Sequence, residues 1–67
     1  MQIIETKLFE NDGTLVELYV MNNSKHAVRL ADTDAGKTVG VTIYPTPEKA
    51  RAGFDGLVAK LAEVGGC

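Results

Sequence analysis

Residues with nucleophilic or metal-binding chemistry are scarce in this sequence, which has one histidine, His26, and one cysteine, Cys67. The two fall in different predicted elements, so we do not expect the hydrogen-bonded Cys–His pair that nucleophilic catalysis needs. A lone cysteine cannot close an internal disulfide, and it is consistent with a reducing compartment. The sequence therefore predicts no enzyme, no cofactor and no metal site.

Long apolar runs and an excess of basic residues are also missing. No segment is long enough to cross a membrane, and the opening residues lack the pattern of a signal peptide. Seven basic residues against nine acidic ones give a net charge of −2, which argues against binding nucleic acid by phosphate neutralisation. With 67 residues and no repeat or linker, we expect one domain over residues 1–67, marginally stable on its own.

Two short segments begin like binding motifs and lack the rest. Residues 35–38, Ala-Gly-Lys-Thr, are similar to the end of a phosphate-binding loop, but they lead into a predicted strand where a phosphate cradle needs a helix N-terminus. Residues 32–36, Asp-Thr-Asp-Ala-Gly, begin like a calcium loop that lacks its bidentate glutamate. The prediction for both is a polar hairpin loop.

A C-terminal helix is indicated by its start signal and by its apolar spacing. Thr46 is a suitable N-cap, Pro47 fits the first helical position, and Glu48 complements the helix dipole. The residues that then recur at helical spacing form one apolar stripe: Ala50, Phe54, Leu57, Val58, Leu61 and Val64.

Glycines carry two further expectations for this helix. Gly65 and Gly66 are expected to end it, because glycine readily adopts the left-handed cap conformation. Gly53 and Gly56 weaken a helix interior, so their presence predicts close packing of the helix on a flat surface such as a sheet.

Four strands are predicted upstream of the helix. Asn11-Asp12-Gly13 and Asn22-Asn23-Ser24 are turn signals that separate the first three, and a polar loop separates the third from the fourth. Such short connections favour an antiparallel meander. The predicted fold class is α+β, a four-stranded antiparallel β-meander with one C-terminal amphipathic helix packed on one face, and the strands run over residues 3–9, 14–21, 26–31 and 38–44.

Strand alternation divides the side chains between two faces of this sheet. The face toward the helix is expected to carry Val16, Leu18, Val28, Leu30, Val41 and Ile43. The opposite face is expected to carry Glu17, Tyr19, Met21, Ala27 and Arg29. Because Tyr, Met and Arg are enriched at the centres of interfaces, we predict a protein-binding patch centred on Tyr19, Met21 and Arg29, with Glu17 and Asp32 at its rim.

A colinear set of turn and core residues lies within residues 15–57: Asn22, Ser24-Lys25, Arg29, Gly36-Lys37-Thr38-Val39-Gly40, Tyr44, Glu48, Phe54 and Gly56-Leu57. In order and spacing this set resembles the phage-encoded type I-F anti-CRISPR family that caps the backbone of the Csy surveillance complex. The resemblance implies a four-stranded antiparallel sheet with helical cover. It further implies a non-catalytic inhibitor in the bacterial cytoplasm, which binds Cas7-type backbone subunits and blocks pairing with target DNA.

The chain also departs from that family. Where the family places a tyrosine at the end of its second strand, this sequence has Met21, with Tyr19 two residues earlier on the same face. The exact target therefore stays open, as does the CRISPR subtype.

Other function classes stay open as well. Four strands and a C-terminal helix also describe coactivator-like modules that bind single-stranded nucleic acid through a basic groove and stacking aromatics. The bases available for such a groove are Lys7, Lys25, Arg29 and Lys37, and the aromatics are Phe9, Tyr19 and Tyr44. An enzyme would have only isolated carboxylates. The oligomeric state is not fixed by the sequence.

Overall fold

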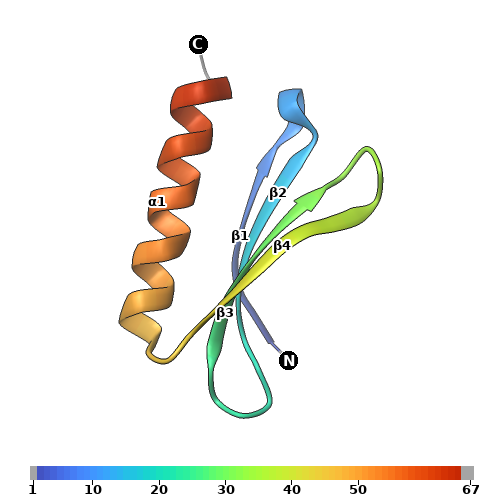
Figure 1. The fold of residues 1–67 in the computed structure, drawn as a ribbon. Coiled ribbons are helices and arrows are strands. Elements are labelled where there is room, and N and C mark those ends of the chain that lie inside the picture. The colour runs from blue at the N-terminus through green and yellow to red at the C-terminus, as the bar shows by residue number, and fades with distance from the viewer. Residues whose placement is uncertain (1, 66–67) are drawn as a thin grey trace.

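The chain folds into one four-stranded antiparallel sheet with a single helix on one face (Figure 1). The computed structural model describes residues 2–65; Gly66 and Cys67, on which two expectations fell, lie outside them, as does the side chain of Val64. The strand order is β1-β2-β3-β4, so the predicted α+β meander is confirmed. The elements are β1 (Gln2–Phe9), the 3-10 turn η1 (Glu10–Asp12), β2 (Thr14–Val20), β3 (His26–Asp32), β4 (Lys37–Tyr44) and α1 (Pro47–Gly65).

The turns form as their sequences predict, and two of them are joined at one end of the sheet. Gly13 follows η1 with a φ of 62°, a left-handed conformation that suits glycine. Its carbonyl accepts the backbone N–H of Thr33 at 2.8 Å. Thr33 belongs to the β3–β4 loop, where the Asp32 carboxylate accepts the N–H groups of Asp34 and Ala35 at 3.0 and 3.1 Å. The first hairpin turn and the last one are therefore fastened together.

The helix begins where the capping signal predicts. The Thr46 hydroxyl accepts the backbone N–H of Lys49 at 3.2 Å, and the Thr46 carbonyl accepts that of Ala50 at 3.1 Å. Pro47 is the first helical residue, a position at which its missing N–H removes no hydrogen bond.

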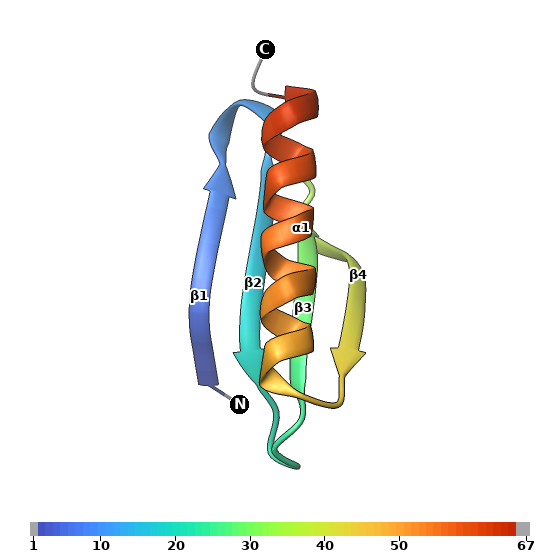
Figure 2. The ribbon, with the colours of Figure 1, turned by 90° about the vertical axis from the view of Figure 1, so that its left-hand side faces the viewer.

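The core lies between α1 and the two central strands. Figure 2 shows α1 running over β2 and β3, with β1 and β4 extending to either side of it. Phe54 is only 2% exposed and is one of the largest fully enclosed side chains. The residues that pack around it are Val16, Leu18, Val28 and Ala50, with Phe9, Leu30, Tyr44, Leu57, Val58 and Leu61 partly buried against them.

One expectation about β4 is wrong. Val41 and Ile43 were expected to face the helix, but their partners in β3 are Arg29 and Ala27, which lie on the far side of the sheet. The pairing of Val28 with Thr42 instead turns Gly40, Thr42 and Tyr44 toward α1. The physical reason is that α1 covers only the central strands, so an edge strand gains little burial on that side. Tyr44 provides the contact that β4 makes with the core.

An ion pair connects α1 to the strand that it covers least. The Arg51 guanidinium donates a hydrogen bond to the Glu5 carboxylate on β1 and lies 5.7 Å from the centroid of the Phe54 ring. The hydrogen bond to Glu5 raises the pKa of Arg51, so the charge on this side chain is retained. Both side chains are solvent-accessible, which limits what such a pair contributes to stability.

Phe54→Ala tests the position of the core. We expect it to lower the free energy of unfolding by roughly 3–5 kcal/mol, because it removes the aromatic ring on which α1 is docked. Denaturant unfolding followed by circular dichroism measures the loss. Leu8→Ala, at an exposed position of β1, is the matched control and should cost far less. Equal losses for the two variants would mean that α1 does not dock through Phe54.

The two glycines in the middle of α1 have opposite surroundings and give a paired test. A Cβ at Gly53 would lie 2.6 Å from Cζ of Tyr44, whereas a Cβ at Gly56 would meet nothing within 4 Å. Gly56→Ala should therefore raise stability by up to about 1 kcal/mol through helix propensity alone. Gly53→Ala should lack that gain, because the Tyr44 ring must move. An equal rise in melting temperature for both variants would show that Tyr44 does not pack on Gly53.

Candidate protein-binding face

The side of the sheet opposite α1, which we call the outer face, is not covered by any described element (Figure 1). Strand register arranges its side chains in three rows that run across the sheet. In order from β1 to β4 the rows are Ile3, Tyr19, Ala27 and Ile43; then Thr6, Glu17, Arg29 and Val41; then Leu8, Leu15, Ala31 and Thr38.

The outer face has an enclosed centre and an exposed apolar periphery. Tyr19, Ala27 and Ala31 lie on the central strands and are buried although no layer covers them. Ile3 and Ile43, at the two ends of the first row, are each 52% exposed, and Leu8 and Val41 are each 47% exposed. Large exposed apolar side chains that cluster on one face are typical of interaction surfaces.

An ion pair occupies the middle row of this face. Arg29 Nε lies 2.7 Å from Glu17 Oε1, although its N–H direction does not make a directed hydrogen bond. The same guanidinium donates through Nη1 to the Thr38 hydroxyl at 3.0 Å. Arg29 is thus tied to the strands on both sides of its own, and its charge is balanced by Glu17.

Two hollows adjoin Tyr19 on the same face. One, of about 320 Å3, is lined by Ile3, Glu17, Tyr19 and Arg29. The other, of about 360 Å3, lies at the β2–β3 turn and is lined by Tyr19, Met21, Asn22 and Asn23. Tyr19 therefore borders both depressions, and each is large enough to receive a protruding side chain from a partner.

The predicted site residues are only partly brought together. Glu17, Tyr19 and Arg29 share the outer face, as strand alternation predicted. Met21 follows the last residue of β2. It adjoins the patch, because it lines one of the two hollows together with Tyr19. Asp32 ends β3, and its carboxylate is engaged by backbone N–H groups of the following loop.

Tyr19, predicted at the centre of an accessible patch, is instead almost buried, with only 8% of the residue exposed. Because β2 is a central strand, the ring is enclosed by the neighbours that register places beside it, Ile3 on one side and Ala27 on the other. Sequence reasoning also missed the exposed apolar periphery. The alternating Val41 and Ile43 were a signal for it, but the pattern was attributed to the core.

The described residues offer little for a metal ion. Within residues 2–65 no group of three or more His, Cys, Asp or Glu side chains could hold a metal ion. Nδ1 of His26 is buried without a hydrogen-bond partner at the start of β3, opposite Val20 and Tyr44.

No helix in the described range combines the length and the apolar character that crossing a membrane requires.

Comparison of the chain with protein-family models, curated proteins and solved structures finds no match.

Tyr19→Ala is expected to destabilise the fold. Removing a ring that is almost fully enclosed should lower the free energy of unfolding by about 2–3 kcal/mol, somewhat less than in a core covered on both sides. Tyr19→Phe, which keeps the ring, should cost less than about 1 kcal/mol. Chemical denaturation of the two variants beside the parent measures both values, and an unchanged midpoint for Tyr19→Ala would contradict the observed burial.

Proposed function

We propose that this chain is a non-catalytic protein-binding domain that acts through the outer face and inhibits the partner that it binds. The observation that supports the proposal is the set of exposed apolar side chains, Ile3, Leu8, Val41 and Ile43, on a face that no described element covers. While these side chains face water, the favourable free energy of burying them is not gained. A partner surface would recover it.

The open shape of the outer face fits a protein partner. The two larger principal dimensions of the Cα trace are 36 and 23 Å, and the third is 16 Å. The longest of these dimensions runs along the strands of the sheet (Figure 2). An open face with shallow hollows suits a protein surface better than a small ligand, which needs an enclosing pocket.

The charge distribution favours a protein over a single-stranded nucleic acid. Arg29 is the base in the three rows of the outer face, and its charge is balanced by Glu17. Lys7 lies on the helix side of β1, in register with Val16 and above the ring of Phe9 at 5.8 Å. Bases and exposed aromatic rings are thus not gathered on one surface, as a stacking platform for bases would require.

The partner class that we propose is the Cas7-type backbone subunit of a type I CRISPR surveillance complex, as the sequence resemblance implies. Binding to that backbone would inhibit without chemistry, since a bound domain obstructs the path along which target DNA pairs with the guide. The apolar periphery of the outer face would supply the contacts, and the Glu17–Arg29 pair would lie between them. The proposal therefore assigns affinity to the periphery rather than to Tyr19 alone.

Two adjacent isoleucines provide the test. Ile3 is 52% exposed on the outer face, and Ile4 is 47% exposed beside Pro47 and Arg51 on the helix side. Ile3→Lys should weaken binding to purified type I-F Csy complex by roughly tenfold or more, a loss of about 1.4 kcal/mol. Ile4→Lys, the matched control, should leave the affinity unchanged. Biolayer interferometry gives the affinities, and a gel-shift assay with target DNA gives the inhibition.

The outcomes separate the parts of the proposal. If the parent chain does not bind the Csy complex, the proposed partner is wrong. If Ile4→Lys weakens binding as much as Ile3→Lys, the outer face is not the contact surface. Salt-sensitive binding of the parent to a single-stranded oligonucleotide would instead favour the nucleic-acid module.

A further inference from the structure

The two edge strands of the sheet differ in how well they are protected from pairing with another chain. β1 carries Glu5 and Lys7 within its length, and charges of this kind discourage further pairing. β4 has a single charge, on Lys37 at its first position, and β-branched residues fill most of its length. An uncharged, extended and unpaired edge is a template for another strand.

We propose that β4 pairs antiparallel with β4 of a second copy of this chain, over Gly40–Tyr44 and about a two-fold axis at Thr42. The ends of the regular part of β4 set this register. A register shift between Leu30 and Ala31 leaves Val39 as the extra residue just before Gly40. Pro45, just after Tyr44, lacks a backbone N–H and cannot continue a ladder. Thr42 is the centre of the five residues between these limits.

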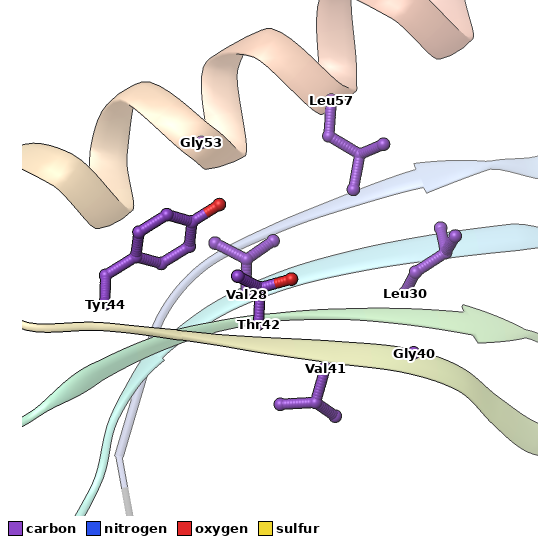
Figure 3. A pocket seen from close by; sticks show the side chains of 8 residues that line it. All are labelled: Val28, Leu30, Gly40, Val41, Thr42, Tyr44, Gly53 and Leu57. Carbon is purple, nitrogen blue, oxygen red and sulfur yellow. The ribbon is translucent and has the colours of Figure 1, made fainter.

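Side chains on the helix side of β4 are complementary in this register. Gly40 of one copy would lie directly opposite Tyr44 of the other. A Cβ at Gly40 would meet nothing within 4 Å, so the space beside it is empty. Figure 3 shows the resulting pocket of about 380 Å3 between α1 and β4, into which Leu30, Leu57 and Tyr44 point. An aromatic ring across from a glycine is a recognised means of stabilising an edge pairing.

The remaining pairs of the same register are also favourable. On the outer face, Val41 of one copy would lie opposite Ile43 of the other, and both side chains are about half exposed in the single chain; Figure 3 shows Val41 pointing away from α1. Thr42 of one copy would lie opposite Thr42 of the other. Pairs of β-branched residues and pairs of threonines both stabilise antiparallel strands.

Charge also fits a second copy as the occupant. The paired segment is uncharged, so self-association is not opposed there by like charges. The antiparallel direction brings the Lys37 end of each β4 toward the end from which α1 of the other copy begins, where Glu48 lies in the first turn. Neither Lys37 nor Glu48 forms an ion pair with another described residue of its own chain. Two symmetric attractions between opposite charges would flank the paired strands.

This pairing is independent of the proposed inhibitory function. Joining two sheets edge to edge leaves both outer faces open, and it places them side by side as one continuous eight-stranded surface.

A charge swap at the two-fold axis tests the proposal. Thr42 is exposed, so Thr42→Lys and Thr42→Glu should each leave the fold intact, which thermal unfolding checks. Each variant would place like charges directly opposite one another and should raise the dimer dissociation constant by roughly tenfold or more. An equimolar mixture of the two should form heterodimers again. Sedimentation velocity over increasing protein concentration measures all three, with the parent expected to shift from monomer to dimer.

The matched control is Thr6 on β1, an exposed threonine of the opposite edge that also faces the outer side. Thr6→Lys should dimerise like the parent; loss of the dimer in this variant would point to association through the outer face or through β1 and would overturn the proposal. The proposal would also be overturned if the parent stayed monomeric at every concentration. It would equally be overturned if a mixture of Thr42→Lys and Thr42→Glu formed no heterodimer.

A cross-link provides a readout that does not depend on charge. In a Cys67→Ser background, Thr42→Cys places the new cysteine of one copy opposite the same cysteine of the other. Their Cβ atoms would then be as close as those of any two residues directly opposite on paired strands. Oxidation should give a disulfide-linked dimer for Thr42→Cys and none for Thr6→Cys. The reverse pattern would contradict pairing through β4.

Discussion

The width of one helix is the constraint on which the rest of this structure depends. An α-helix with its side chains is about 10–12 Å across, whereas four strands spaced about 4.8 Å apart make a wider layer. The single helix α1, docked through Phe54, therefore covers β2 and β3 and leaves both edge strands and the whole outer face without a second layer. In so short a chain, the described residues supply one enclosed core and two kinds of open surface, a face and an edge.

Much of this arrangement could be predicted because it depends on local chemistry. The Thr46 cap, the helix from Pro47 and the left-handed Gly13 all follow from residue types at fixed positions, and the strand order follows from short connections. The side on which Val41 lies could not be predicted in the same way. Alternation gives two faces but not their identity, and the pairing of Arg29 with Val41, which is a tertiary fact, decides between them.

The candidate site was predictable to a similar extent. Strand alternation was sufficient to place Glu17 and Arg29 on one face, but only the register of the β2–β3 hairpin makes them direct neighbours and hence an ion pair. Burial of Tyr19 depends on β2 having a paired strand on each side, and the local sequence around Tyr19 does not indicate this. The outward position of Ile3 depends on a register shift just after it, and a bulge interrupts the alternation from which exposure is inferred.

Each strand of this sheet pairs with its neighbour along the chain, and the outer face is built from those pairings alone. Loops that are this short are quick to close, and folds dominated by local contacts form rapidly. The surface that we assign to binding therefore needs only hairpin pairings, whereas α1 must return across the sheet to complete the core. The hydrogen bond from Thr33 to Gly13 ties the first and last hairpin turns together without help from the helix, so the backbone that carries the outer face is held by contacts within the sheet.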